Sequence, residues 1–544
     1  MEKKFSALQR GSLTGQLQNQ YFDLIIIGGG VTGAGIALDA ASRGMKTALI
    51  EMQDFAAGTS SRSTKLIHGG LRYLKQLEIK LVAEVGKERA IVYKNAHHVT
   101  HPEVMLLPLI KGGSLSKIEA FLGLTLYDYL ARVKKGERRK MLSKEEAILI
   151  EPLLRKDILT GGVSYYEYRT DDARLTIEIL KKAFELGALA INYTKVTGFI
   201  YRREHIKGVK VKDLTTGTDY EVKGSQIINA GGPWVDEVSM LDNFAEGKKL
   251  HLTKGVHLVV DYIKLPLRHS VYFDVPDGRM IFAIPREGKT YIGTTDTDYY
   301  GKLEEPEITA KDRDYLLKAC NSMFPGAPLS PSDVESGWAG LRPLVKGKGE
   351  SPSAISRKDE LFVSKTGLIT IAGGKLTGYR KMAQRATNVA ALRLEKGGKD
   401  YSSCSTKKIK LSGGDTGEDF EAFAKEKTQE GVAVGLPIED AAFLAKTYGS
   451  NTTILFNYYK EAPYDKLLQA RLQYAIEHEM AATLSDYFIR RTGGLYFNIA
   501  EVKKTMENAA NNMAKLLSWS DEQKQLNIKE LEGKINAIEL INKV

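Results

Sequence analysis

The chain begins its regular pattern with an apolar run, a glycine turn, a helix of small residues and a second apolar run. Residues 22–27 are apolar and β-rich over a length that is too short for a helix and suits a buried parallel strand. Residues 34–43 are typical of a helix with small side chains, and residues 46–50 predict a second strand that ends at Glu51. Together they predict a βαβ unit.

Three glycines join the first strand to this helix in the spacing G-x-G-x-x-G. Gly28 allows the tight turn, Gly30 lets the backbone approach a pyrophosphate, and Gly33 lets helix and strand pack closely. The helix N-terminus offers its N–H groups to the anion, and Glu51 can accept hydrogen bonds from a ribose diol. A glycine-rich turn alone is weak evidence, but strand, glycines, helix, strand and acid in register predict a dinucleotide site.

Strand patterns that end in glycines return twice more, at residues 226–234 and 368–390. Residues 194–228 form short alternating runs broken by turn residues, which predicts an antiparallel meander. Residues 250–300 hold several more strand-like runs, best assembled as a second sheet that carries the substrate site. A simple NAD dehydrogenase has one such glycine turn, so the repeated returns favour a chain that encloses a flavin dinucleotide.

These patterns divide the chain into three parts and give an α/β fold class. Residues 1–20 are polar and are expected to form a flexible arm. Residues 21–400 predict a Rossmann-like dinucleotide-binding domain with an interleaved antiparallel-sheet substrate domain, and include helical patterns at 76–98 and 172–188. Residues 401–544 are expected to form a helical C-terminal domain.

Composition narrows the class of protein only in part. The 544 residues are 43% hydrophobic and 27% charged, as in globular proteins, and the chain shows neither a membrane-spanning run nor a signal-peptide core. Cys320 and Cys404 are far apart without metal-ligand spacing, which fits a reducing compartment. The net charge of +11 favours an anionic partner, which charge alone leaves open among a phosphorylated substrate, a nucleic acid and an acidic membrane surface.

One amphipathic segment has two interpretations. Apolar residues recur at helical spacing over residues 114–130, and a basic run follows at 132–140. The segment could be an interfacial helix with a cationic rim for anionic lipid. It could equally be an ordinary amphipathic helix followed by a solvated turn, which is the commoner case.

A series of motifs identifies a family. From about residue 21 to 390 they are GGGVTGAG, GTSSRSTKLIHGGLRYL, TDDARL, NAGGPWVD, TKGVHLVV, IGTTDTD, WAGLRPL and AGGKLTGYRKMA, with EHEMAATLSDYFIRRT at 477–492. In combination they resemble the FAD-dependent glycerol-3-phosphate dehydrogenases. The resemblance implies a glutathione-reductase/D-amino-acid-oxidase-like fold, FAD, and oxidation of sn-glycerol 3-phosphate to dihydroxyacetone phosphate by hydride transfer from C2 to flavin N5.

The same resemblance implies where the protein works and with what. Electrons pass to membrane quinone, and the protein is cytoplasmic and held peripherally on the inner face of the cell membrane, in agreement with the positive charge. The expected partners are the substrate, the quinone and an anionic membrane surface, with no nucleic acid and with a homodimer left open. No metal site is expected, because His97, His98 and His101 lack a carboxylate or cysteine to complete a ligand set.

The substrate is a small dianion with a secondary alcohol, so its site needs fixed cations. An isolated arginine is most often a surface ion pair, but a planar guanidinium suits phosphate because it donates bidentately and stays charged. By resemblance, the substrate-binding residues are Arg72, Tyr73, Arg342, Arg357 and Lys375.

Oxidation of the alcohol also needs a base near the hydroxyl. His257, in a strand-like run, resembles a histidine that the family places near flavin and substrate, and histidine titrates in the useful range. A satisfied core histidine is the competing interpretation, and a neighbouring arginine is a second candidate for the proton. His68 is expected to pack against the flavin. The catalytic set is therefore His257, Arg342 and Lys375.

The FAD contacts come from two sources. The fingerprint itself supplies Gly28, Gly30, Gly33 and Glu51. The resemblance supplies Thr59, Ser60, Lys65, Leu66, His68, Gly69, Val196, Ala230, Gly231, Lys375, Leu376 and Thr377. The helix that opens near residues 375–377 should point its N-terminus at the O2/N1 edge of the flavin and stabilise the anionic reduced form.

Three alternatives share parts of this pattern. A glycerol-3-phosphate oxidase has the same fold with O2 as acceptor, but such relatives usually carry an extra insertion in the middle of the chain, which is absent here. A flavoprotein amine or amino-acid oxidase is disfavoured by the cluster of cationic positions. A nucleic-acid-modifying flavoprotein would need basic and aromatic residues over a broad face.

Overall fold

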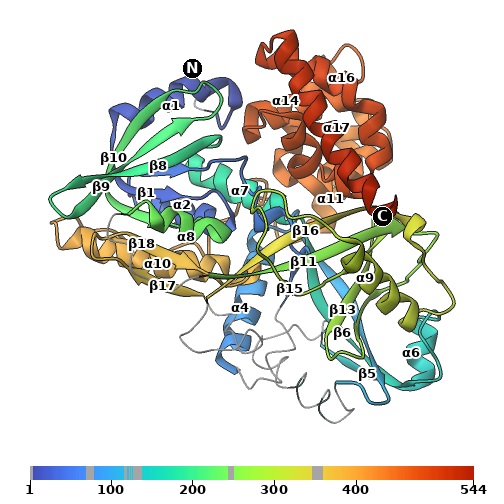
Figure 1. The fold of residues 1–544 in the computed structure, drawn as a ribbon. Helices are drawn as coiled ribbons and strands as arrows, with labels where there is room; N and C mark the ends of the chain where they lie inside the picture. Colours follow the sequence, from blue (N-terminus) through green and yellow to red (C-terminus); the bar gives the residue numbers. More distant parts are fainter. Residues whose placement is uncertain are drawn as a thin grey trace.

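The computed structural model describes residues 4–68, 79–114, 138–242, 250–345 and 359–543, with single residues 119, 121, 123, 125 and 136 between them (Figure 1). The described chain builds two sheets and a group of C-terminal helices. Both sheets take their strands from the same part of the chain, between Tyr21 and Ala372, because the chain crosses between them several times.

The nucleotide sheet has a parallel centre. Its strands follow the order β17-β18-β10-β1-β2-β7, with β17 antiparallel to β18. Their bounds are β1 (Tyr21–Ile27), β2 (Thr47–Ile50), β7 (Leu189–Ile191), β10 (Asp219–Asn229), β17 (Glu360–Val363) and β18 (Ile369–Ala372). Strand β1 is buried from Phe22 to Ile27, as expected of a central parallel strand covered on both faces.

Helices α2 (Val31–Ser42), α7 (Asp172–Glu185) and α10 (Tyr379–Glu395) pack around this sheet, with α2 in contact with both others. The predicted strand-turn-helix units at 22–51 and 368–390 are confirmed by β1, α2 and β2 and by β18 and α10. The predicted meander is also confirmed, since β8 (Thr194–Arg202), β9 (His205–Asp213) and β10 pair antiparallel.

The second sheet is mostly antiparallel and follows the order β15-β11-β14-β13-β12-β4-β6-β3, with β16 on β11 and β5 on β6. As expected, residues 250–300 supply several of its strands, namely β11 (Leu250–Asp261), β12 (Ser270–Asp274), β13 (Met280–Arg286), β14 (Lys289–Gly293) and β15 (Thr297–Asp298). The other strands are β3 (Leu66–Ile67), β4 (Thr100–Ile110), β5 (Lys140–Leu142), β6 (Leu159–Thr170) and β16 (Val334–Val345).

The other α-helices after α1 lie outside the two sheets. Helices α4 (Ile79–Asn95), α6 (Lys144–Ile150), α8 (Val235–Met240) and α9 (Ala310–Met323) precede α10 in the chain. The C-terminal helical region, residues 420–543, comprises α11 (Phe420–Ala433), α12 (Ile438–Tyr448), α13 (Thr452–Glu461), α14 (Lys466–Glu479), η9 (Asp486–Arg491), α15 (Gly494–Phe497), α16 (Ile499–Leu517) and α17 (Asp521–Lys543). Among the described helices, none is long and apolar enough to cross a membrane.

The expected flexible arm is wrong for the part of it that the structure describes. Residues Ala7–Gln9 form a 3₁₀ turn and Arg10–Asn19 form α1, in which Leu13 and Leu17 are buried. Phe5 stacks on Phe55 with 5.6 Å between ring centroids. The polar composition hid two leucines one helical turn apart, which is enough to bury one face of a short helix against the nucleotide sheet.

Two other predictions concern the amphipathic segment near residues 115–137 and the three histidines His97, His98 and His101. The amphipathic segment at 115–137 lies almost wholly outside the described residues, so its membrane role stays a prediction, as does the domain boundary near residue 400. His97 and His98 follow the end of α4 and His101 lies in β4, not on one helix face. Burial lowers the pKa of both His98 and His101 to about 3, so both imidazoles are neutral at physiological pH.

Candidate active site

Two adjoining cavities lie where the carboxyl ends of β1, β10 and β18 meet β11 and β16 of the second sheet. One, the dinucleotide groove, lies along the glycine turn after β1, and the other, the inner cavity, lies beside β11 and β16. Carboxyl ends of parallel strands are where α/β proteins bind ligands. The two cavities share a wall formed by Thr59, Ser63, Pro343, Gly374, Lys375 and Leu376.

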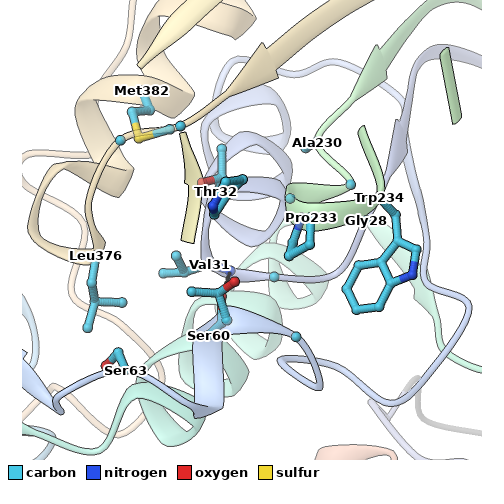
Figure 2. Close-up of a pocket in the computed structure, with 18 of the residues that line it drawn as sticks. Gly28, Val31, Thr32, Ser60, Ser63, Ala230, Pro233, Trp234, Leu376 and Met382 are labelled. Atoms are coloured by element: carbon cyan, nitrogen blue, oxygen red, sulfur yellow. Dashed lines mark hydrogen bonds between the residues drawn. The ribbon is translucent and has the colours of Figure 1, made fainter. Parts of the chain in front are cut away.

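The glycine turn forms one side of the dinucleotide groove. Gly28 has φ +111°, and a Cβ there would lie 2.5 Å from the Ala230 carbonyl oxygen. A Cβ on Gly33 would lie 1.9 Å from the Gly28 carbonyl oxygen, so Gly33 shapes the turn from beneath without lining the groove. Gly30, Val31 and Thr32 line the groove at the start of α2 (Figure 2). The backbone therefore presents a helix N-terminus to an anion.

Glu51 lies in the wall of the same groove. Its carboxylate accepts the Gly29 N–H at 2.6 Å and the Gln53 N–H at 2.7 Å, one on each oxygen. Burial raises the pKa of the Glu51 carboxyl, against the effect of these two donors. Each oxygen of an ionised carboxylate has two acceptor positions, so both can also accept from a ribose diol.

The groove also has apolar walls, which include residues that the sequence did not indicate. Trp234 and Pro233 lie beside Ala230 and Gly231, and Met382 lies opposite (Figure 2). Trp234 follows Gly231 closely and could have been found from the same motif. Met382 had no signal in the sequence, because it lies inside α10, beyond the predicted glycine turn.

The loop after Glu51 runs between the two cavities. The Thr59 hydroxyl donates to the Leu341 carbonyl at 2.7 Å, and the Ser60 hydroxyl accepts the Val31 N–H at 2.9 Å. The Thr377 hydroxyl accepts the His68 N–H and donates to the His68 carbonyl, both at 3.0 Å. Leu66, His68, Leu376 and Thr377 line the inner cavity.

Besides Gly33, two described residues that were predicted to bind the cofactor, Lys65 and Val196, line neither cavity. Lys65 is buried, and its ammonium donates to the Asp172 carboxylate at 2.6 Å and to the Ser61 carbonyl at 3.0 Å. Val196 is buried within β8, and its contact with FAD stays a prediction. Asp172 also accepts from the Ser63 N–H and hydroxyl, so the lysine and the aspartate order the loop that borders the inner cavity.

His257 points into the inner cavity from the middle of β11. Its neighbours in register are Gly293 on β14 and Trp338 on β16, and a Cβ on Gly293 would lie 2.2 Å from the imidazole. The ring stacks on Trp338 at 4.8 Å and its Nε2 lies 3.0 Å from the Thr64 hydroxyl. Burial, and then the nearby Arg342 cation, lower the pKa of His257 well below its usual value. The imidazole is therefore neutral, and its surroundings in the structure disfavour the protonated form.

Arg342 reaches the same cavity from β16. Its Nη1 donates to the Thr295 carbonyl and to Asp296 at 3.1 Å, and its Nη2 donates to the Thr294 hydroxyl at 2.9 Å. A Cβ on Gly255 would lie 2.3 Å from Nη2, so this glycine leaves room for the guanidinium. Lys375 lines both cavities just before α10. Two cationic side chains and a neutral histidine thus converge on one cavity.

Four predicted residues lie outside the described parts of the chain: Gly69, Arg72, Tyr73 and Arg357. Their assignment stays a prediction. Within the described ranges, the groove offers a glycine cradle, a helix N-terminus and an ionisable acid, and the cavity beside it offers cations and a base. These groups fit a flavin dinucleotide with an anionic alcohol as its reaction partner.

Family models and curated relatives place this chain in the same family of proteins. The family model of FAD-dependent oxidoreductases matches residues 23–380, and that of the C-terminal domain of alpha-glycerophosphate oxidase matches residues 404–524. The aerobic glycerol-3-phosphate dehydrogenase of Bacillus subtilis (strain 168) is 52% identical and covers 98% of both chains. That of Staphylococcus haemolyticus is 54% identical and covers 97% of this chain and 96% of its own.

Solved structures that resemble this chain agree with that family. The glycerol-3-phosphate dehydrogenase from Bacillus halodurans, complexed with FAD, has a TM-score of 0.86 and 46% identity over 98% of each chain. An L-alpha-glycerophosphate oxidase from Mycoplasma pneumoniae with FAD bound has a TM-score of 0.57 and 20% identity, over 71% of this chain and 97% of its own, and shows a shared fold.

Proposed function

Because this chain belongs to the FAD-dependent glycerol-3-phosphate dehydrogenase family, we propose that it oxidises sn-glycerol 3-phosphate to dihydroxyacetone phosphate and passes the electrons to a membrane quinone. The convergence of His257, Arg342 and Lys375 on the inner cavity is the observation that carries this proposal. Bound FAD would be held by the glycine turn after β1, by Glu51 and by the turn that precedes α10, and it would supply the acceptor for the hydride of C2.

The chain's own residues hold the substrate dianion. The Arg342 guanidinium is fixed by three hydrogen bonds to residues 294–296, so it is oriented before the phosphate arrives. Lys375, at the shared wall of the two cavities, adds a second positive charge to the phosphate side. Arg72, Tyr73 and Arg357 complete the substrate site in this proposal.

His257 takes the hydroxyl proton. Its imidazole is buried and neutral, and the Thr64 hydroxyl holds one edge of the ring. A phosphate dianion that pairs with Arg342 reduces the positive field at the histidine, which raises its proton affinity when substrate is present. The base is thereby strengthened at the moment when a proton must be accepted.

Quinone is favoured over O2 as the acceptor. The relatives at 52–54% identity are named aerobic dehydrogenases, whereas the oxidase of known structure is 20% identical. The net charge of +11 supports peripheral contact with an anionic membrane surface, which we place at the cytoplasmic face of the cell membrane. A homodimer could also carry out this reaction, but the proposed function does not depend on it.

A steady-state assay separates the two acceptors. Purified holoenzyme should reduce a soluble quinone analogue when glycerol 3-phosphate is added, and should form little H2O2 in air without it. Turnover in air that produces H2O2 at the same rate as quinone turnover would instead assign an oxidase.

A further inference from the structure

A buried ionic cluster joins the C-terminal helical region to the loop that follows Glu51. Asp54, in that loop, is 1% exposed. Arg491 donates to both of its oxygens, Nη1 to Oδ2 at 2.6 Å and Nη2 to Oδ1 at 2.9 Å. Arg490 donates its Nε to the same carboxylate. Two consecutive arginines of η9 therefore bind one aspartate from the N-terminal part of the chain.

Gln53, which lies between Asp54 and Glu51 in this loop, links the ionic cluster to the Glu51 carboxylate. The Gln53 N–H donates to Glu51 Oε1 at 2.7 Å, and the Gln53 carbonyl accepts the Tyr193 N–H at 2.9 Å. The Tyr193 hydroxyl donates to Asp486, which also pairs with Arg490 at 2.6 Å. Gln53, whose N–H donates to the Glu51 carboxylate, is thus held through its carbonyl by Tyr193 and is followed directly by Asp54, and both of these residues contact η9.

The charges are arranged to keep Asp54 ionised. Burial opposes its ionisation, but the two guanidinium groups outweigh burial and hold the pKa of the Asp54 carboxyl below its usual value. Buried ion pairs seldom increase stability over apolar packing, because desolvation offsets the attraction. What a forked arginine pair does supply is a fixed geometry for the carboxylate and for the backbone that carries it.

We propose that Arg490 and Arg491 are positioning residues for the cofactor. By fixing Asp54 they hold the Glu51 carboxylate in the geometry that accepts the ribose hydroxyls, and the C-terminal helical region thereby retains FAD. This role requires FAD binding, which the family establishes, and is independent of the substrate and of the electron acceptor.

The competing explanation is that the cluster only docks the C-terminal helices. A second contact serves as the matched control, because it also docks them but lies away from the Glu51 loop. The Arg313 Nη1 of α9 donates to the Ile541 carbonyl of α17 at 2.7 Å, and Arg313 is buried like the arginines of η9.

The test compares Arg491→Lys with Arg313→Lys in the full-length protein. Both variants keep a positive charge and lose the guanidinium, but only the first breaks the fork on Asp54. FAD would be removed and titrated back, and its Kd read from flavin fluorescence together with the thermal unfolding midpoint of the FAD-free protein. We expect Arg491→Lys to raise the Kd for FAD about tenfold, with Arg313→Lys close to wild type.

Tyr193→Phe provides a second variant that removes a single hydroxyl from the same network. It should weaken FAD binding several-fold even if Arg491→Lys fails to fold, since the phenyl ring keeps its packing. Kd values within twofold of wild type for both Arg491→Lys and Tyr193→Phe would overturn the proposal. Equal weakening of FAD binding by Arg313→Lys would overturn it too, because it would assign the effect to docking alone.

Discussion

The imidazole Nε2 of His257 lies 3.0 Å from the hydroxyl of Thr64. Thr64 is itself held, since its carbonyl accepts from the Tyr291 hydroxyl at 3.1 Å, and Trp338 donates to the carbonyl of the preceding residue at 3.0 Å. In the described structure, Nδ1 of His257 is buried without a hydrogen-bond partner. The Thr64 hydroxyl therefore supplies the hydrogen bond that orients the ring, which also stacks on Trp338.

Replacing Thr64 by valine should slow flavin reduction without weakening substrate binding. Valine has nearly the same shape but cannot hydrogen-bond to Nε2, so the base is no longer held in one orientation. We expect the rate of flavin reduction to fall about tenfold, measured by anaerobic stopped-flow absorbance. Thr64→Ser keeps a hydroxyl and should recover most of the rate, and a valine variant as fast as wild type would remove Thr64 from the account.

Removing the imidazole itself should have a larger effect. His257→Ala deletes the proposed base, and positioned bases contribute roughly 10²–10⁴-fold. The rate of flavin reduction should fall by that order while the substrate Kd changes much less, because the phosphate contacts remain. Equal reduction rates for wild type and His257→Ala would show that another group takes the proton.

Arg342→Lys should act mainly on binding. Lysine keeps the charge but cannot hold the three hydrogen bonds to residues 294–296 and still present a planar fork to phosphate. The KM for glycerol 3-phosphate should rise about 10- to 100-fold. The surface variant Arg155→Lys, whose partner is Asp157, is the control and should leave the KM unchanged. A fall in kcat at constant KM would contradict a binding role.

The buried imidazole of His98 should make stability depend on pH. Burial lowers the pKa of His98 to about 3 in the folded state, below the unfolded value of about 6.5. The unfolded chain then binds the proton first as the pH falls, so this contribution to stability is complete above about pH 6.5 and decreases below it. At pH 5 the burial of neutral His98 should lower the free energy of unfolding by about 2 kcal/mol, relative to its value above pH 6.5.

Urea unfolding at pH 7 and pH 5 measures this loss of stability. His98→Gln cannot be protonated and should show a smaller decrease in the free energy of unfolding between the two pH values. If the variant and the wild type lose the same amount, burial of a neutral His98 is not a source of the acid sensitivity.

Local patterns predicted the nucleotide-binding half of the site. The strand, glycine turn and helix at 22–51 form one short continuous stretch, so the period of the apolar positions and the glycine spacing determine them with little help from the rest of the chain. The same holds for the meander and for the turn before α10. Strands β4 and β6 were not predicted, because they pair with each other across a long intervening segment, so neither stretch of sequence shows its partner locally.

The parts of the site that the sequence did not predict depend on contacts between residues far apart in the chain. Thr64 meets His257 only because a strand and a loop far apart in sequence fold together, and a lone threonine in a polar loop carries no sign of that role. Lys65 was assigned to the cofactor by resemblance. Its ammonium pairs with Asp172, and its contact with FAD stays a prediction. The prediction of a flexible arm at residues 1–20 was wrong for a related reason. Leu13 and Leu17 form a buried helix face only where they pack against the nucleotide sheet, which the local sequence does not show.

An anaerobic absorption spectrum of the purified holoenzyme, recorded before and after addition of glycerol 3-phosphate, tests the proposed substrate and cofactor together. We expect the oxidised-flavin band to bleach without any added electron acceptor, because the proposed site brings substrate, base and flavin together in one cavity. A flavin band that persists at saturating glycerol 3-phosphate would contradict the assigned substrate, while leaving the fold and the cofactor in place.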